Sequence, residues 1–360
     1  MSLALLGDAL LYAVLPAYAS DFGLTLPWVG ILLSANRLVR VFAYGLIARM
    51  THQFGVRTMC IIAAFMATGT TAIYGIGYGP VTLLAARVLW GLTYAILVLA
   101  TLTYAVEFRA HAGTRVGISQ AIQRLGPIFA LIGGSWLVGV VGPQATFVYL
   151  AIPTAVSILI AMRLPKAKAK TAHKTKATSL SKPAPIDVIF FLQGFGVDGV
   201  FAVTITLIFA READLSTAVL SGGALLAMRH LGEAIAAPLF GWTADKWGAR
   251  RIFIVAEVLT MCGFFAVASG LTIAGAIVML IFRGALASLG PAVITQSLDE
   301  TSDAIGPLAR MQAWRDLGAA LGPLVTGVLL AVVSAELQHA GVALAMGAGL
   351  IYWVMRPTTV

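Results

Sequence analysis

The stretch Gly241-Trp242-Thr243-Ala244-Asp245-Lys246-Trp247-Gly248-Ala249-Arg250-Arg251 separates two long apolar runs of the chain. Asp245 and Lys246 are costly in lipid, so we expect the preceding apolar helix to end near Gly241. Two glycines allow the backbone to reverse within a few residues. Three cations in one short loop are typical of the cytoplasmic side of a membrane protein. The stretch therefore predicts a cytoplasmic hairpin between two membrane helices.

The composition of the chain is that of a membrane protein. Of its 360 residues, 59% are hydrophobic and 11% are charged, against roughly 25% charged residues in soluble proteins. The formal net charge of +9 is found on some nucleic-acid-binding proteins, but here the cations lie in short loops and one linker, where they set membrane topology. Cys60 and Cys262 belong to no metal-ligand cluster, so we expect two free thiols and no bound metal.

The apolar runs predict membrane-spanning helices of about 20 residues each. The first run, residues 2–20, lacks a positively charged start and is interrupted by Asp8 and Pro16, so we expect a membrane helix rather than a cleaved signal peptide. We predict an all-α polytopic membrane protein with twelve helices, at residues 2–20, 27–48, 58–77, 80–105, 115–141, 144–163, 186–209, 217–241, 251–270, 273–295, 309–334 and 339–356.

Basic residues are distributed unevenly between the two ends of these helices. With the N-terminus inside, 16 of the 24 Lys and Arg residues fall in cytoplasmic loops, linker and tail, and one, Arg211, falls on the opposite side. The positive-inside rule then places both termini in the cytoplasm. We expect a multi-pass protein of the bacterial inner (plasma) membrane.

Residues 165–185 contain Lys, Ala, Thr, Ser and Pro with almost no apolar side chain. Such a segment buries no core and predicts a disordered basic cytoplasmic linker. It divides the chain into an N-terminal six-helix bundle, 1–164, and a C-terminal one, 186–360. An internal repeat with an offset of 190 to 196 residues supports this division. Its pairs are Asp8 and Asp198, Arg37 and Arg229, Arg87 and Arg283, and Gln120 and Gln312.

The pattern Gly-x-x-x-Asp-Lys-x-Gly-x-Arg-Arg in residues 241–251 resembles the loop motif of the major facilitator superfamily, the largest group of secondary transporters. The resemblance implies two homologous six-helix bundles, with access to a central cavity alternating between the two sides of the membrane. It also implies that Asp245 helps to latch the cytoplasmic side, toward the start of the fifth helix near Arg109 and Arg115. The other gate residues of the motif are Gly241, Lys246, Gly248 and Arg250.

The first half of the chain departs from this motif. Arg49 stands where the family has the aspartate that faces the N-terminal end of the eleventh helix. A helix N-terminus favours a carboxylate over an arginine, but here the segment before that helix carries Asp299, Glu300 and Asp303. We hypothesise a charge-swapped latch in which Arg49 or Arg57 meets these acids. The alternative is a degenerate loop beside a solvated acidic one.

Glycine and proline recur in the fifth and eleventh spans, as Gly126-Pro127 and as Gly318 with Gly322-Pro323. Small residues at helical spacing let two helices approach closely, and proline bends a helix. The pattern resembles a superfamily motif found mostly in exporters that exchange substrate for protons. It favours export, and plain small-residue packing is the alternative.

Ionisable residues inside membrane spans are candidates for function. Asp8 and Asp198 occupy equivalent places in the first helix of each half, which in this family lines the central cavity, so each is a candidate proton carrier. The alternative is a structural acid paired to an arginine. Glu233 is either a further proton site or a neutralising partner of Arg229 at i,i+4 spacing. Glu257 ranks low because the ninth helix of the family is usually peripheral.

Arginines outnumber carboxylates within the spans, which favours binding of an anionic group. Arg37 and Arg229 look like the paired cavity arginines of some superfamily anion carriers, although the Gly-rich motif of the nitrate carriers is absent. Arg87, in Arg87-Val88-Leu89-Trp90-Gly91, matches the fourth-span arginine of proton-coupled members, which implies coupling to the cytoplasmic gate. The further substrate-binding candidates are Arg40, Arg124, Tyr12 and Trp314.

Together these features predict a proton-coupled secondary transporter that exports a small organic compound by proton antiport. An importer or exchanger of organic anions is one alternative, and a transport-inactive membrane receptor or scaffold is another. The sequence contains no Walker phosphate loop and no nucleophile constellation, so we expect neither ATP-driven transport nor an enzyme. The expected partners are a small-molecule substrate, protons and the lipid bilayer, with no cofactor and no nucleic acid, and the expected state is a monomer.

Overall fold

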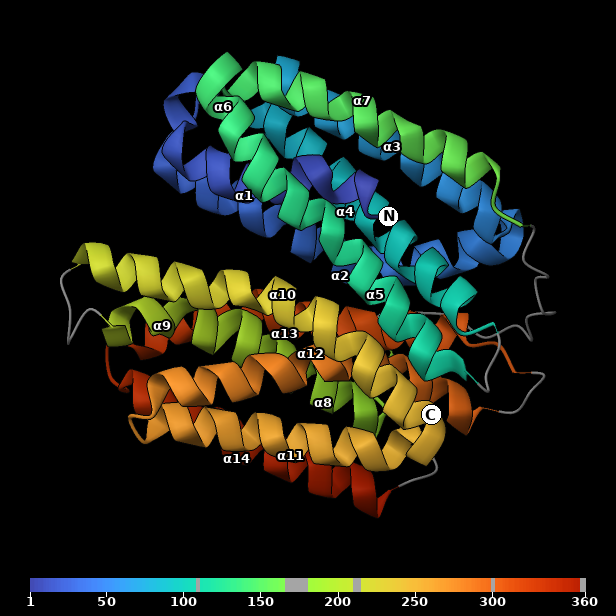
Figure 1. Ribbon diagram of the computed structural model, residues 1–360, viewed down its shortest axis with the longest axis vertical. Helices are drawn as coiled ribbons and strands as arrows, with labels where there is room; N and C mark the ends of the chain where they lie inside the picture. The colour runs from blue at the N-terminus through green and yellow to red at the C-terminus, as the bar shows by residue number, and fades with distance from the viewer. Residues whose placement is uncertain (108–110, 166–180, 210–214, 299–301, 357–360) are drawn as a thin grey trace. The chain divides into compact units, whose positions relative to one another are not determined.

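The computed structural model describes residues 1–107, 111–165, 181–209, 215–298 and 302–356, and every regular element in these ranges is a helix (Figure 1). The chain forms two compact units. The first comprises Met1–Tyr104 and Ile122–Ser179, and the second comprises Ala105–Ala121 and Leu180–Val360. Helix α5 (Ala112–Phe129) therefore contributes residues to both units.

Besides part of α5, the first unit contains helices α1 to α4, α6 and α7. Their bounds are Leu6–Ala17 for α1, Leu26–Phe54 for α2, Val56–Ile76 for α3, Pro80–Ala105 for α4, Ser135–Val141 for α6 and Pro143–Met162 for α7. Short 3-10 helices, η1 (Leu3–Leu5) and η2 (Ala19–Phe22), flank α1, and the π-helix η4 (Ala130–Gly134) joins α5 to α6. Helices α3 and α7 lie side by side (Figure 1).

Aromatic rings fix the core of the first unit. Phe147 of α7 meets Phe22 edge-on at a centroid distance of 6.2 Å and Tyr74 of α3 at 5.8 Å. Such pairs contribute about 0.5–1.5 kcal/mol each beyond the burial of their surface. Leu10 and Leu11 of α1 are buried in the same cluster. This packing holds α1, and with it Asp8, against the other helices of the unit.

The second unit is built from seven further helices. Their bounds are Pro185–Gln193 for α8, Ala202–Phe209 for α9, Leu215–Trp247 for α10, Ala249–Ala268 for α11, Thr272–Ser297 for α12, Ile305–Leu329 for α13 and Ala335–Met355 for α14. The π-helix η5 (Gly194–Phe201) joins α8 to α9. Helix α11 packs against α12 and α14 (Figure 1), with Phe264, Met279 and Val342 in the shared core.

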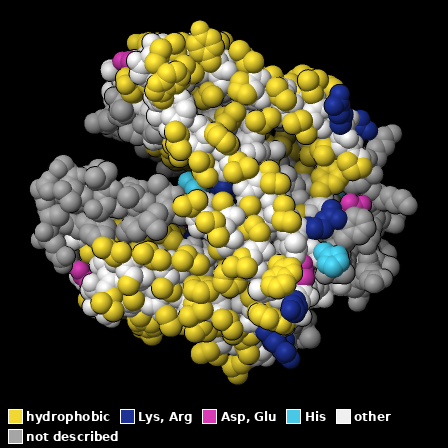
Figure 2. Space-filling model, viewed as in Figure 1, with side chains coloured by type: hydrophobic (Ala, Val, Ile, Leu, Met, Phe, Trp, Pro, Cys, Tyr) yellow, Lys and Arg dark blue, Asp and Glu magenta, His cyan; other side chains and the backbone are white. Residues whose placement is uncertain are grey.

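Much of the exterior of these helices is apolar. Large hydrophobic side chains such as Ile76 and Val328, each 76% exposed, lie on this exterior. On the face that Figure 2 shows, hydrophobic side chains lie over much of the described part. Within the described residues, 9 helices are long and apolar enough to cross a membrane. The remaining predicted spans, near residues 2–20, 217–241 and 309–334, are also helical over most of their length. The predicted all-α, twelve-helix membrane fold is confirmed.

Two predicted helix ends are wrong, and both lie at charged turns. Helix α10 runs through the predicted hairpin to Trp247, and the chain reverses at Gly248, whose φ of +91° suits glycine. Helix α2 likewise continues past Arg49 to Phe54 and ends at Gly55, with a φ of +83°. Charges are costly in lipid, but they do not end a helix that extends beyond it, because the backbone hydrogen bonds stay within the helix.

Of the linker predicted over 165–185, residues 166–180 lie outside the described part of the chain. Lys182 and Pro183 are exposed, and α8 begins at Pro185, one residue before the predicted span. Proline fits the first turn of a helix because the N–H that it lacks has no partner within the helix there.

Candidate functional site

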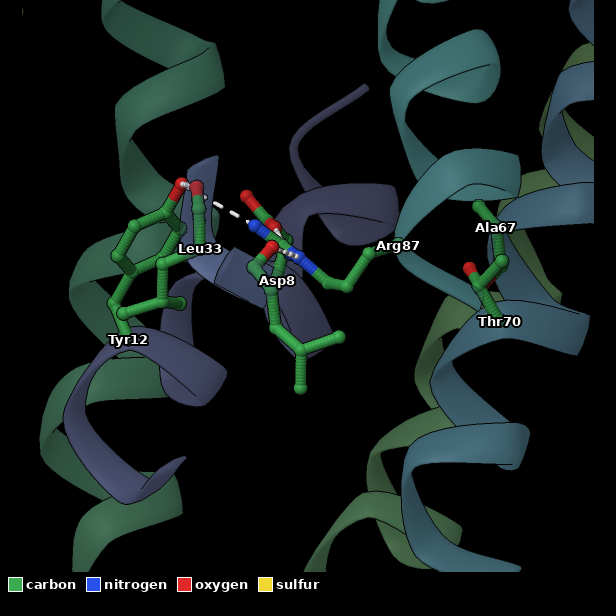
Figure 3. A network of polar contacts seen from close by, with 7 residues as sticks. Asp8, Tyr12, Leu33, Ala67, Thr70 and Arg87 are labelled. Atoms are coloured by element: carbon green, nitrogen blue, oxygen red, sulfur yellow. Dashed lines mark hydrogen bonds and ion pairs between the residues drawn. The ribbon is translucent and has the colours of Figure 1, made fainter. Parts of the chain in front are cut away.

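Arg87 of α4 gathers polar groups of the first unit (Figure 3). Its buried guanidinium pairs with Asp8 of α1. The Arg87 Nε donates to the Leu32 carbonyl at 2.9 Å, and Nη2 donates to the Tyr12 hydroxyl at 3.3 Å. Tyr12 in turn donates to the Leu33 carbonyl at 3.4 Å. One guanidinium therefore ties together α1, α2 and α4.

The chemistry of arginine explains this arrangement. A guanidinium offers five N–H donors in a planar fork, and a buried one is costly unless these donors are used. Asp8 is less enclosed, since 13% of its side chain is accessible, and Tyr12 is 38% exposed. The Asp8 carboxylate thus lies at the less enclosed edge of the cluster.

Arg283 of α12 holds two carboxylates of the second unit. It pairs with Glu233 of α10, and its Nη2 lies 3.2 Å from Oδ2 of Asp198 in η5. All three residues are buried. Because the two carboxylates share the donors of one guanidinium, a proton taken up by either of them leaves more of these donors to the other. This arrangement is suited to binding and releasing a proton.

The two clusters occupy equivalent positions in the internal repeat. Asp198 follows Asp8 by 190 residues, and Arg283 follows Arg87 by 196. In each unit, the structure joins the repeated carboxylate to the repeated arginine. Such pairing is the alternative left open by the sequence, and proton transfer at these carboxylates stays a prediction.

Glu233 was open to two interpretations in the sequence, as a proton site or as a partner of Arg229. Its carboxylate pairs with Arg283, 50 residues further along the chain. Arg229 lies one turn earlier in α10, and its side chain is outside the described part of the structure.

The π-helix η5 places Asp198 at the second cluster. A π-helix is wider than an α-helix and often occurs at functional sites. A Cβ atom at Gly194 would meet the Arg315 carbonyl oxygen, and one at Gly199 would meet the Gly322 backbone. The glycines of η5 therefore let this segment lie directly against the backbone of α13.

Arg40 has the best-defined surroundings among the arginines predicted to bind substrate. Its guanidinium lies over the ring of Tyr94, 4.3 Å from the centroid, and the residue is 7% exposed. This is cation–π geometry. Arg37 of α2 and Arg124 of α5 are partly buried, and the fourth, Arg229, has no described side chain.

The two aromatic candidates have partners within their own units. Trp314 of α13 donates its indole N–H to the Ser181 carbonyl at 3.3 Å, and its ring meets Phe191 edge-on at 6.3 Å. Tyr12 is part of the Arg87 cluster, and the Arg87 guanidinium lies 5.3 Å from the centre of its ring. Substrate contact by either ring stays a prediction.

Asp245 caps the start of α5. Its carboxylate accepts the backbone N–H groups of Gly113 at 2.9 Å and Thr114 at 2.7 Å, and both belong to the second unit. The unpaired N–H groups and the dipole of a helix N-terminus favour a carboxylate. The start of the fifth helix is the location that the resemblance implied for Asp245. Arg115 lies in the same first turn, and Arg109 is outside the described residues.

Close backbone contact accompanies this cap. A Cβ atom at Gly113 would meet the Gly241 carbonyl oxygen, and one at Gly117 would meet the Ala237 carbonyl oxygen. Gly241 lies inside α10, so it permits this approach rather than the chain reversal predicted for it.

Two cations of the motif, Lys246 and Arg250, lie over aromatic rings. The Lys246 ammonium is 5.3 Å from the centre of the Trp242 ring and 5.8 Å from that of Trp247. The Arg250 guanidinium is 5.3 Å from the centre of the Trp353 ring. Basic and aromatic side chains at helix ends are typical of a membrane–water interface. We interpret this end of α10 and α11 as lying at such an interface.

The predicted charge-swapped latch is only partly covered by the described residues. Arg49 is exposed on α2, and Arg57 donates to a backbone carbonyl at the end of α7. Asp303 accepts a backbone N–H group at the start of α13 at 3.2 Å. Asp299 and Glu300 are outside the described part, and the latch stays a prediction.

Gly126 lets α5 lie close to the N-terminal segment in the first unit. Its N–H donates to the Ser2 hydroxyl at 2.8 Å, and a Cβ atom there would meet the Ser2 carbonyl oxygen. Pro127 follows within α5, and the π-helix η4 begins three residues later. Proline removes one N–H from the ladder, and a local π-turn is one way in which membrane helices adjust to this loss.

Gly318 and Gly322 let α13 lie close to α8 and η5 in the second unit. Cβ atoms at these positions would meet the carbonyl oxygens of Phe191 and Phe195. Pro323 follows inside α13 and lies beside η5. The three glycines singled out in the sequence thus lie where another segment passes closely, and each of the two prolines directly follows one of them.

Two buried carboxyl groups were missed or ranked low in the sequence. Asp187 has no exposed surface, and its Oδ2 accepts Arg310 Nε at 2.5 Å and the Ala184 N–H at 2.8 Å. The signal that would have pointed to Asp187 is an acid at the third position of a helix that begins with proline. Glu257 is also fully buried, and Gln193 donates to it at 2.6 Å.

Comparison with solved structures shows the same architecture in known transporters. The human organic anion transporter MFSD10 (TETRAN) has a TM-score of 0.78 at 14% identity, covering 98% of this chain and 96% of that one. The E. coli fucose:proton symporter FucP has a TM-score of 0.77 at 13% identity, covering 99% and 97%. The proton:xylose symporter XylE has a TM-score of 0.75 at 12% identity, covering 98% and 93%. At these identities the likeness is one of fold.

The family itself is shown by the sequence. The comparison with curated proteins gave no match. The model of the Major Facilitator Superfamily matches residues 1–228 and 187–360, which together span the whole chain. This chain belongs to the major facilitator superfamily.

Proposed function

We propose that this chain is a proton-coupled secondary transporter that exports a small organic compound in exchange for protons. The observation that carries the proposal is the pair of arginine–carboxylate clusters, one in each unit, at equivalent positions of the repeat. Burial of an arginine is unfavourable unless a partner compensates for the lost water. A carboxylate that pairs with it can take up a proton and give up the ion pair. Proton-coupled transport needs groups of this kind.

The proposed roles rest on these two clusters and on the residues that the sequence repeat pairs. Protonation of Asp8 removes the charge that holds Arg87, and so loosens the contacts of Arg87 with α1 and α2. In the second unit, protonation of Asp198 or Glu233 has the same effect on Arg283. Arg37 and Arg229 hold the anionic part of the substrate, with Arg40, Arg124 and Trp314 around it.

The Asp245 cap of α5 acts in this proposal as a cytoplasmic latch. Two charge-assisted hydrogen bonds to backbone N–H groups stabilise one state, and their loss accompanies the other. Lys246, Gly248, Arg250 and Arg115 complete the gate. Both termini then lie in the cytoplasm of a bacterial inner membrane, and the transporter acts as a monomer without a cofactor.

Export by antiport is supported by the glycine and proline pattern of α5 and α13, which resembles that of proton-driven exporters. Organic-anion exchange is a second candidate, favoured by the likeness of fold to the human organic anion transporter MFSD10. The two functions differ in what drives flux, a pH gradient in the first and a counter-anion in the second.

Transport by proteoliposomes tests the proposal. A thermal-shift screen of anionic, zwitterionic and cationic compounds supplies the ligands, and uptake of each is measured with and without an imposed pH gradient. Antiport predicts uptake driven by an acidic lumen and reduced at least about 10-fold in Asp8→Asn and Asp198→Asn, because both lose a proton site. Glu107→Gln, at an exposed residue, is the control and should leave uptake unchanged.

Two other outcomes contradict antiport. Uptake stimulated by internal anion and indifferent to pH indicates an organic-anion exchanger. Binding without flux for every ligand indicates a receptor or scaffold.

A further inference from the structure

A buried carboxyl group lies apart from both arginine clusters. Glu257 of α11 has no exposed surface, and Nε2 of Gln193, the last residue of α8, lies 2.6 Å from its Oε2. Its Oε1 is buried and has no hydrogen-bond partner among the described residues. Within the same residues no cation pairs with this carboxyl group, and Gln193 is its one polar contact.

Charged groups on the elements packed against α11 have other partners. Asp187 of α8 pairs with Arg310, Arg283 of α12 binds Asp198 and Glu233, and Nδ1 of His339 in α14 lies 2.8 Å from the Ala335 carbonyl. The other described titratable side chains on α10, α11 and α14 are those of His230, Asp245, Lys246, Arg250, Arg251, Cys262, Glu336 and Tyr352, and Arg356 directly follows α14. None of these forms a hydrogen bond or ion pair with Glu257 in the described structure.

A carboxylate in these surroundings would be buried without a counter-charge. Burial of an isolated ionised carboxylate is so unfavourable that the group takes up a proton instead.

Glutamine is a suitable partner for a carboxyl group that changes its protonation state. Rotation of its amide presents the carbonyl oxygen to a carboxylic acid or the N–H group to a carboxylate. An arginine or lysine offers only donors and would hold the group ionised.

We propose that Glu257 is a second kind of proton-binding site, protonated in this conformation, with Gln193 as its amide partner. The inference goes beyond the proposed function and does not depend on it. Gln193 directly precedes η5, which carries Asp198.

Infrared spectroscopy of the full chain in lipid at neutral pH tests this site. The C=O stretch of a protonated carboxyl group is expected in the wild type and lost in Glu257→Gln, whereas Glu107→Gln, an exposed control, retains it. Gln193→Leu removes the hydrogen bond and is expected to move the same band to higher frequency. A band that is unchanged in Glu257→Gln overturns the proposal, and a band that Gln193→Leu leaves in place overturns the partner.

Stability gives a second, independent readout. Glu257→Gln keeps the shape and neutrality of a protonated glutamate, so its unfolding temperature is expected to match that of the wild type. A marked fall in that temperature, or failure to fold, means that the ionised form is needed and overturns the proposal. Neither measurement involves transport, so their failure is distinct from failure of the proposed function.

Discussion

At the residue scale, Arg87 connects three helices through one side chain. Its contacts with Asp8, Tyr12 and the Leu32 carbonyl use the planar fork of donors that only arginine provides. Lysine has a single ammonium group and cannot reach the same set of acceptors. The stability of the first unit and the proposed proton coupling therefore depend on the same residue.

Truncation of Arg87 tests the pair directly. We expect Arg87→Ala to lower the free energy of unfolding by about 3–5 kcal/mol, because the partly buried Asp8 loses its counter-charge. The measurement is denaturant unfolding in detergent micelles. Arg163→Ala, at an exposed arginine of the same unit, is the control and is expected to change little.

The double variant Arg87→Met with Asp8→Leu removes both charges and is expected to regain much of the loss, because apolar side chains replace a buried ion pair at little cost. A double variant as unstable as Arg87→Ala would show that the pair is not what holds these helices.

At the element scale, Asp245 joins two helices by capping one of them. The sequence placed it in a hairpin, but the structure places it in the last turns of α10, with its carboxylate on the first turn of α5. Helix α10 can extend that far because Lys246 and Trp247 are exposed at its end. The cap is therefore a contact between elements: the family resemblance implied its place at the start of the fifth helix, and the structure shows which backbone groups it uses.

Loss of this cap is expected to loosen the start of α5. Asp245→Ala should lower the free energy of unfolding by about 1–2 kcal/mol, as for other helix caps. Hydrogen exchange of the Gly113 and Thr114 amides should accelerate, because both lose their acceptor. Arg251→Ala, exposed on α11, is the control. Unaltered exchange at these two amides would contradict the cap.

The glycines of α13 make a second prediction at this scale. A Cβ atom at Gly318 meets the Phe191 carbonyl oxygen, whereas one at Gly327 meets nothing within 4 Å. Gly318→Ala is expected to cost about 1–3 kcal/mol through overpacking. Gly327→Ala, in the same helix, should gain up to about 1 kcal/mol from helix propensity. Thermal unfolding of the two variants compares them, and equal effects would refute close packing at Gly318.

At the scale of the whole molecule, the distribution of basic residues predicts topology. A labelling experiment in cells checks it, with Cys60 and Cys262 replaced by serine and single cysteines placed at the exposed positions Lys182 and Ser269. The cysteine at 269 should react with a membrane-impermeant maleimide from outside, and the one at 182 only after permeabilisation. The reverse pattern would invert the predicted orientation.

The division into two bundles, at 1–164 and 186–360, stays a prediction at this scale. The structure resolves two compact units, but it groups Ala105–Ala121, including the start of α5, with the second of them. The sequence could not indicate this, because contacts such as that of Gly113 with Asp245 join residues 132 positions apart.

The sequence by itself determined the class, the family and the order of helices. A long apolar run forms a helix in lipid, because a helix satisfies its own backbone hydrogen bonds. These bonds join residues close together in the sequence, so the sequence alone predicts them. The repeat also indicated which carboxylates and arginines correspond in the two halves. Such signals lie in the order of residues along the chain.

Only the tertiary structure decided which charged and polar side chains meet. Asp8 with Arg87, Asp187 with Arg310, and Gln193 with Glu257 join residues from different helices. Whether a buried charge is paired, shared or neutralised by a proton depends on the neighbours that packing brings within about 4 Å of it. Helix ends were misplaced for another reason: charges beyond the lipid do not end a helix, because its backbone hydrogen bonds stay within it.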